Sequence, residues 1–255
     1  MSDPETTAGV PSEQELADVV TNYSRVKRAV EACADSRSVR LVAVGKTKHV
    51  SMIQAVYRAG HRDFGENYVN ELCDKAEFVS KAGPEYADIS WHFIGALQTN
   101  KAKKLVAAPN LCVVETVDRE KVANALEKAC ADVGRHELLK VFVQVNVSGE
   151  DSKSGCAPTE APALCAHVRE NCPHLKLAGL MTIGKPDDSE QPQAFSDLLN
   201  VRQQVASALQ LDLTKEPLEL SMGMSNDFER AIRMHSTNVR VGSTIFGARL
   251  YADQK

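Results

Sequence analysis

Short runs of apolar residues recur along the chain, and segments with the apolar spacing of a helix separate them. Strands that are apolar throughout and alternate with helices are typical of a parallel sheet covered by helices. We predict strands at Leu41–Val44, Arg62–Phe64, Trp91–Ile94, Cys112–Val114, Val141–Val147, Lys176–Met181, Leu218–Met222 and Val239–Val241.

The same pattern predicts a helix ahead of the first strand. Ser12 and Glu15 have the spacing of a capping box, in which each side chain satisfies an unpaired N–H group of the first turn. An apolar stripe with helical period follows, formed by Leu16, Val19, Tyr23, Val26, Val30 and Cys33. Before it, residues 1–11 are small, polar and interrupted by Pro and Gly, so we expect a disordered N-terminal tail.

Later helices are predicted between the strands, with N-caps at Ser51 (in Ser51-x-x-Gln54) and Asp118. Helical period also marks two further segments, Val122–Val133 and Phe195–Leu209.

The number of strand–helix units favours a closed (β/α)8 barrel of the TIM type. Such barrels typically have ~250 residues, and the chain has 255 residues without a break in composition. A doubly wound open sheet would show the same alternation, although no G-x-G-x-x-G motif opens the first βα turn. We therefore predict one α/β domain over residues 12–255, a (β/α)8 barrel with an extra N-terminal helix.

Composition narrows the function. The net charge is −4 and the Lys and Arg residues are dispersed, so no nucleic-acid groove is indicated. No apolar run approaches the ~20 residues that a membrane span needs. Seven scattered cysteines form no Cys-x-x-Cys pair or zinc-like cluster, which predicts reduced thiols and no metal site. Because the N-terminus lacks a targeting pattern, we expect a cytoplasmic protein, with a mitochondrial fraction left open.

Lys46 is the most informative candidate for chemistry. If Val42, Val44 and Lys46 share one face of the first strand, the amine points into the barrel mouth. Partial desolvation there would lower its pKa and make it a nucleophile for an aldehyde. Lys48 is a rival for this role. His92, within the third strand, is more typical of a buried structural histidine.

A phosphate site is indicated at the other end of the chain. The seventh strand ends in Ser221-Met-Gly-Met-Ser225, and the eighth runs into Gly242-Ser243 before a helix. Turns of this kind direct N–H groups and hydroxyls outward, and barrels commonly bind phosphate after strands seven and eight. Closure of the sheet would bring the first strand beside them. A phosphate cradle near an amine describes a site for pyridoxal 5′-phosphate (PLP).

Other polar residues follow strand ends. Asn67 could hydrogen-bond a ring substituent of such a cofactor, whereas Glu115 and Asn146 are expected to be structural hydrogen-bonders. The loops at 148–155 and 184–192 could act as lids or be ordinary surface loops. No hydrolytic triad is evident, and we assign no catalytic residue.

The chain resembles the pyridoxal phosphate homeostasis protein family, whose barrel is similar to the N-terminal domain of alanine racemase. The motifs that carry the resemblance are Leu41-Val-Ala-Val-Gly-Lys-Thr-Lys48, Phe64-Gly-Glu-Asn-Tyr68, Trp91-His-Phe-Ile-Gly95, Gly179-Leu-Met-Thr-Ile183, Leu220-Ser-Met-Gly-Met-Ser225 and Val239-Arg-Val-Gly-Ser-Thr-Ile-Phe-Gly247. One departure is Gly45, where the family usually has serine.

The resemblance implies how the cofactor would be held. It implies a PLP Schiff base on Lys46 and places the phosphate on the turns of Ser225 and Gly242-Ser243. It also places Arg240 beside the pyridine nitrogen and adds Met222 to the cofactor-binding residues, together with Asn67.

The implied function is PLP homeostasis, meaning storage, buffering or delivery of the cofactor without substrate turnover. A guanidinium beside the ring nitrogen opposes its protonation, which weakens PLP as an electron sink. The chain ends at Lys255, directly after the barrel, so we expect no second domain with a racemase's tyrosine base. A PLP-dependent amino-acid racemase is the alternative, and a cofactor-free interaction module is a third class. Expected partners are PLP and PLP-dependent apo-enzymes, with the chain a monomer or a weak homodimer.

Overall fold

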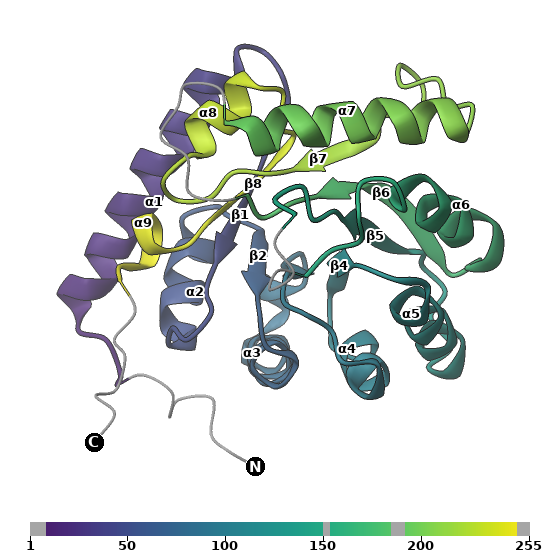
Figure 1. The fold of residues 1–255 in the computed structure, drawn as a ribbon. Coiled ribbons are helices and arrows are strands. Elements are labelled where there is room, and N and C mark those ends of the chain that lie inside the picture. Colours follow the sequence, from purple (N-terminus) through teal and green to yellow (C-terminus); the bar gives the residue numbers. More distant parts are fainter. Residues whose placement is uncertain (1–8, 150–153, 185–191, 249–255) are drawn as a thin grey trace, which may run out of the picture.

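Eight parallel strands close into a barrel in which each strand pairs with the next and β8 pairs with β1 (Figure 1). The computed structural model describes residues 9–149, 154–184 and 192–248. The strands are β1 (Arg40–Val44), β2 (Asp63–Glu66), β3 (Ser90–Phe93), β4 (Leu111–Val117), β5 (Leu139–Gln144), β6 (Leu175–Met181), β7 (Glu219–Ser221) and β8 (Asn238–Val241). Closure confirms the predicted (β/α)8 barrel and rules out the open doubly wound sheet.

Helices surround the barrel and connect its strands (Figure 1). They are α1 (Glu13–Ala34), α2 (Val50–Arg58), α3 (Val69–Ala82), α4 (Ala102–Val106), α5 (Glu120–Asp132), α6 (Ala161–Asn171), α7 (Gln193–Ala208), α8 (Phe228–Arg233) and α9 (Ser243–Phe246), with short 3-10 turns η1 (Pro84–Tyr86) and η2 (Thr99–Lys101).

The extra N-terminal helix α1 covers the place where the barrel closes. It packs against α2 from the start of the barrel and against α8 and α9 from its end (Figure 1). Its capping box is present: the Ser12 N–H donates to Glu15 Oε2 at 2.7 Å, and the Glu15 N–H donates to Ser12 Oγ at 3.3 Å. Residues 1–8 lie outside the described residues, so the disordered tail stays a prediction.

Two predicted caps are wrong. Helix α2 starts at Val50, and its cap is His49, whose Nδ1 accepts the Ser51 N–H at 3.2 Å. Helix α5 follows Arg119, and no side chain caps its first turn. At α2, the imidazole nitrogen of His49, one residue before the helix starts, therefore serves as the cap that the Ser51 hydroxyl was expected to provide.

All eight predicted strands are present, but several boundaries shift. Strand β2 continues to the buried Glu66, and β4 continues past the buried Glu115 to Val117. A prediction based on apolar residues ends the strand at a charged residue, although the backbone pairing between strands includes Glu66. Strand β5 stops at Gln144 because Val145 instead bridges to Cys156.

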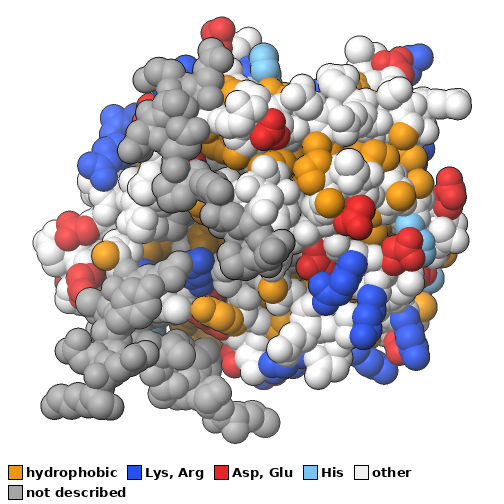
Figure 2. Space-filling view, viewed as in Figure 1, with side chains coloured by type: hydrophobic (Ala, Val, Ile, Leu, Met, Phe, Trp, Pro, Cys, Tyr) orange, Lys and Arg blue, Asp and Glu red, His pale blue; other side chains and the backbone are white. Residues whose placement is uncertain are grey.

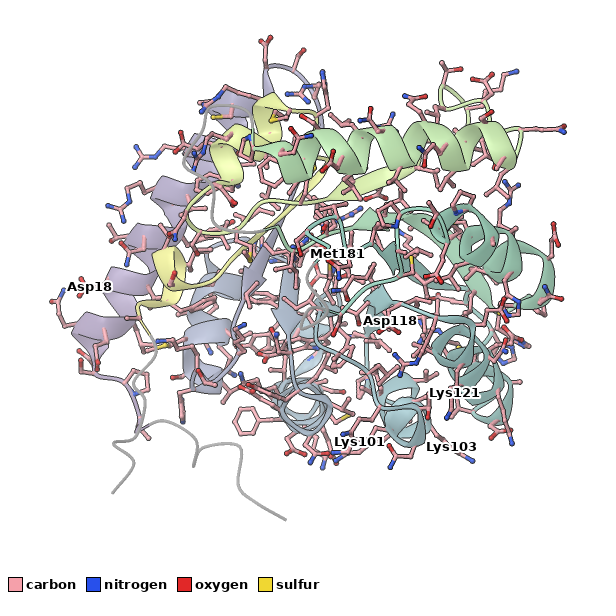
Figure 3. All side chains as sticks on the ribbon, viewed as in Figure 1. Asp18, Lys101, Lys103, Asp118, Lys121 and Met181 are labelled. Carbon is pink, nitrogen blue, oxygen red and sulfur yellow. The ribbon has the colours of Figure 1, made fainter. Side chains whose placement is uncertain are left out.

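The interior of the barrel is only partly apolar. Val42, Val44 and Ile94 form a small cluster inside it, and Met181 packs with Val113, Phe142 and Ala178 in another. Figure 3 shows Met181 within the ring of strands. A larger apolar core lies between the strands and the helices. The rest of the barrel interior is polar, and this part supports the site.

Within the described ranges, no helix is both long and apolar enough to span a bilayer. Nor does that part of the chain contain a cluster of His, Cys, Asp and Glu suited to a metal ion. All seven cysteines are free thiols, as predicted. On the face drawn in Figure 2, Lys and Arg side chains lie among Asp and Glu side chains, so charges of both signs are mixed there.

Candidate functional site

A pocket of about 420 Å³ opens at the carboxyl ends of the strands. Its volume lies within the ~300–1,000 Å³ range of small-molecule sites. The residues that line it lie at or beyond the carboxyl ends of β1, β2, β3, β6, β7 and β8: Val44, Lys46, Lys48, Asn67, Ile94, Ile183, Gly184, Met224, Ser225, Asn226, Asp227, Arg230, Arg240, Gly242, Ser243 and Gly247. This is the face on which TIM-type barrels carry their active sites.

Lys46 follows β1 and is half-buried in the pocket wall. Val42 and Val44 face the barrel interior, which agrees with the predicted face of the strand. Lys48 lines the pocket too, and burial lowers the pKa of its amine. Its Nζ donates to the carbonyl of Ala248 at 2.8 Å. Both lysines predicted as candidates therefore reach the same pocket.

The turns after β7 and β8 meet beside these lysines. The Gly242 N–H donates to Ser225 Oγ at 3.2 Å, and Thr244 Oγ1 donates to the Ser225 carbonyl at 3.4 Å. Helix α9 begins at Ser243. The first N–H groups of a helix have no acceptor within it, and they attract anions. The two turns therefore lie together at the pocket, α9 being a single short turn, and their use as a phosphate cradle stays a prediction.

Met222 is the one predicted site residue that the structure keeps out of the pocket. Its side chain is fully buried in an apolar cluster with residues of β6 and α7. Gly223, with φ +97°, separates it from Met224, which lines the pocket and is 39% exposed. The left-handed turn at this glycine is a backbone feature that an apolar pattern does not show.

Sequence reasoning missed several other pocket residues. They are the apolar Ile94, Ile183 and Met224 and the polar Asn226, Asp227 and Arg230. All but Arg230, which lies in α8, are just after a strand or in the turn that follows it, so the common position after strand ends was the available signal. The predicted lid loops lie largely in residues 150–153 and 185–191, outside the described residues, so their lid role stays a prediction.

Asn67 presents an unusual acceptor to the site. Its Oδ1 is buried and, among the described residues, finds no hydrogen-bond partner. The backbone of Asn67 lies against Gly95, where a Cβ atom would be 1.8 Å from the Asn67 carbonyl oxygen. Glycine at position 95 thus allows the Asn67 backbone to approach closely. An orphaned acceptor costs free energy when buried, so it favours a ligand with a donor group.

Arg240 lies at the floor of the pocket with 4% exposure. Its guanidinium donates to Ser221 Oγ and to the Thr182 carbonyl, the latter at 2.8 Å. Burial lowers the pKa of Arg240, and the nearby Glu115 carboxylate opposes that shift from 3.9 Å. A guanidinium stays charged in proteins, so Arg240 brings a fixed, oriented positive charge to the pocket.

Glu115 connects Arg240 to the rest of the barrel interior. Its buried carboxylate accepts hydrogen bonds from Ser221 Oγ at 2.5 Å, Asn238 Nδ2 at 3.0 Å and His92 Nδ1 at 2.8 Å. This confirms the expectation that Glu115 is a structural hydrogen-bonder. Asn146, whose Oδ1 accepts from Ser148 Oγ at 2.9 Å, does not line the pocket.

His92 is held between two carboxylates. Its Nε2 faces Asp63 Oδ1 at 3.1 Å, and its Nδ1 faces Glu115. Ionised carboxylates only accept, so both ring nitrogens must donate and the ring is an imidazolium. Burial alone would lower the pKa of His92, but the bonds to Asp63 and Glu115 outweigh it and raise the pKa. The prediction of a satisfied, buried histidine is confirmed.

Comparisons with known proteins agree with this geometry. The family model of the alanine racemase N-terminal domain matches residues 15–250. A mouse protein named pyridoxal phosphate homeostasis protein is 48% identical over 216 residues, which cover 84% of this chain and 78% of that protein. PipY of Synechococcus elongatus, solved with PLP bound, is 28% identical with a TM-score of 0.75, covering 90% of this chain and 100% of that one.

Alanine racemase of Corynebacterium glutamicum shares the fold alone. It is 16% identical with a TM-score of 0.64, and the match covers 94% of this chain and 64% of the racemase chain.

The buried ion pair of His92 predicts a large effect of its removal. His92→Ala should lower the free energy of unfolding by about 3–5 kcal/mol, the usual cost of leaving a buried charge without its partner. Urea denaturation monitored by circular dichroism measures it. The control is His136→Ala, at an exposed position, which should change the free energy of unfolding by no more than about 0.5 kcal/mol. An equal loss of unfolding free energy in the two variants would contradict the assignment of His92 as a charged imidazolium.

Proposed function

The chain belongs to the pyridoxal phosphate homeostasis protein family, and we propose that it binds PLP in the pocket at the carboxyl ends of its strands. The observation that carries the proposal is the meeting of Lys46 with the turns of Ser225 and Gly242-Ser243 in one pocket. An amine beside an anion cradle suits a phosphorylated aldehyde. A relative of the same fold, PipY, has been solved with PLP bound.

The groups of PLP match the residues of the pocket one by one. The N–H groups at the start of α9 and the hydroxyls of Ser225 and Ser243 would hold the phosphate. The Asn67 Oδ1 would accept from the ring hydroxyl and so gain the partner it lacks among the described residues. Arg240 would donate to the ring nitrogen. Each of these residues lines the pocket and has the chemistry that the corresponding group of PLP would need.

Lys46 is the residue that would hold the cofactor covalently, as a Schiff base. Support comes from its place in the turn directly after β1, where it lines the pocket together with Val44. Lys48, whose Nζ donates to the carbonyl of Ala248, is the second candidate in the same pocket. Met222 is left out of the proposed cofactor contacts, since its side chain lies in the apolar core.

The proposed role is storage, buffering or delivery of PLP without turnover of an amino acid. PLP supplies an electron sink for carbanions when its ring nitrogen is protonated. Arg240 is buried, charged and held by Ser221 and the Thr182 carbonyl, so it would keep that nitrogen unprotonated. The alternative is an amino-acid racemase. PLP-dependent apo-enzymes as recipients, a cytoplasmic location and a monomer or weak homodimer complete the proposal.

Lys46 should carry the cofactor after borohydride reduction. The reduced phosphopyridoxyl group should map to the Lys46 peptide by mass spectrometry, and Lys46→Ala should abolish the yellow absorbance. Lys48→Ala, in the same turn and pocket, should retain both signals. Because a lysine in a turn contributes little packing, Lys46→Ala should cost no more than about 1–2 kcal/mol of stability. Modification of Lys48 instead would reverse the assignment.

The phosphate should supply much of the affinity. Pyridoxal lacks the anion that the N–H groups of α9 and the hydroxyl of Ser225 would bind, so we expect its dissociation constant to exceed that of PLP by at least about a hundredfold. Equilibrium titration of the bound chromophore compares the two vitamers. Inorganic phosphate should compete with PLP. Similar affinities for the vitamers would remove the cradle from the proposal.

Amino-acid turnover should be absent. Incubation with L- or D-alanine and PLP should give no inversion above that of the free cofactor, because Arg240 leaves the ring a poor electron sink. Chiral chromatography of the product measures inversion. Turnover that Lys46→Ala abolishes would favour the racemase alternative over the homeostasis role.

A further inference from the structure

Beneath the turn that carries Lys46 lies a second lysine with a buried ammonium. Lys75, on α3, is 1% exposed. Its Nζ donates to the Gly45 carbonyl at 2.9 Å, to Glu66 Oε1 at 2.8 Å and to Glu71 Oε1 at 2.7 Å. Lysine is seldom fully buried unless it is paired. Here all three donors of the ammonium are used, and none of them points at the pocket.

The turn itself is strained and depends on its neighbours. Thr47 has φ +62°, a left-handed conformation that costs a β-branched residue roughly 1–2 kcal/mol. Such a conformation persists where the surroundings determine it. The Thr47 N–H donates to Glu71 Oε1 at 2.5 Å, and the Lys48 N–H donates to the Gly45 carbonyl at 3.0 Å.

Two backbone groups that flank Lys46 are therefore tied to the same cluster. The carbonyl before it, from Gly45, accepts from Lys75, and the N–H after it, from Thr47, donates to Glu71. Glu71 Oε1 in turn accepts from Lys75. The side chain of Lys46 leaves the backbone between these two anchored points.

Gly45, where the family usually has serine, is packed tightly against this cluster. A Cβ atom at this position would lie 2.3 Å from Ile53 Cδ1 and 3.0 Å from Glu66 Oε1. Glycine thus lets Ile53 and the Glu66 carboxylate approach the turn closely. Burial raises the pKa of Glu66 to about 7, an effect that Lys75 opposes. The ammonium of Lys75 therefore also keeps a buried carboxylate at the turn in place.

We propose that Lys75, Glu66 and Glu71 form a positioning cluster that holds the Lys46 turn in its strained conformation and presents the Lys46 amine to the pocket before a ligand binds. The inference rests on the proposed binding of PLP by Lys46. Preorganisation of this kind raises affinity because binding no longer has to order the turn. The cluster acts through the backbone and does not itself touch the cofactor.

Glu71 is the residue to change, because removal of Lys75 would leave Glu66 buried without its counter-charge and endanger the fold. Glu71 is 13% exposed at its side chain, and Lys75 keeps its other two acceptors without it. Glu71→Ala removes the acceptor of the Thr47 N–H, whereas Glu71→Gln keeps an oxygen there. The matched control is Glu77→Ala, which breaks the exposed i,i+4 pair of Glu77 with Lys81 on the same helix.

Two measurements distinguish the effect of the cluster on the turn from its effect on PLP binding. Amide hydrogen exchange of Thr47, followed by NMR without PLP, reports whether the turn is held. The dissociation constant of PLP and the absorbance band of the bound form report whether holding it matters. Glu71→Ala should speed Thr47 exchange and weaken PLP binding by about tenfold each, the size expected for a lost charge-assisted hydrogen bond. Glu71→Gln should restore both to within about threefold of the parent protein, and Glu77→Ala should change neither.

Each outcome decides the proposal. Equal Thr47 exchange in Glu71→Ala and Glu77→Ala would overturn it, as would faster exchange with unchanged PLP affinity. If Glu71→Gln weakens PLP binding as much as Glu71→Ala does, the negative charge of Glu71 matters for affinity and not the position of the turn, and the proposal fails. If the parent protein binds no PLP at Lys46, the proposed function fails, and mass spectrometry of the borohydride-reduced protein shows this. The amide exchange of Thr47 then still tests the cluster, because it is measured without PLP.

Discussion

The pairing of β1 with β8 is the constraint on which the rest of this structure depends. Its register joins Leu41 to Val239 and Ala43 to Val241, so the first and last strands of the chain run side by side. A Cβ at Gly242 would lie 3.2 Å from the Val44 carbonyl, which shows how closely the two turns beyond these strands approach. Helix α1 packs over the junction from outside and contacts helices from both ends of the chain (Figure 1). Without closure, Lys46 and the turn at Gly242-Ser243 would have no common pocket.

Two buried polar clusters support this pocket from below. One centres on Glu115, which with Ser221 orients Arg240 and pairs with the imidazolium of His92. The other centres on Lys75 and holds the backbone around Lys46. Buried ion pairs contribute little net stability, since desolvation of the charges offsets their attraction. Here they act by orienting other groups. One cluster orients the Arg240 guanidinium, and the other binds the backbone from which the Lys46 side chain leaves.

Membership of the pyridoxal phosphate homeostasis protein family and the geometry of the pocket lead to the same proposed role. The barrel is one that alanine racemases also use, so the fold by itself does not separate a carrier from an enzyme. The difference has to come from the site. Arg240, on the floor of the pocket, is one of the residues on which the proposed carrier role rests.

The sequence alone determined the features that depend on local periodicity. The alternation of strands and helices, the capping box of α1 and the shared inward face of Val42 and Val44 all repeat at short range, so they could be predicted. The tertiary structure decided what depends on distant partners. Strand β2 reaches Glu66 and β4 continues past Glu115, and both buried carboxylates meet charged partners that come from other strands or from α3. Lys75 looks like an ordinary surface residue of an amphipathic helix, and only the packing of α3 under the β1 turn buries it. Met222 and Met224 have the same chemistry, and the left-handed turn at Gly223 decided which of them faces the pocket.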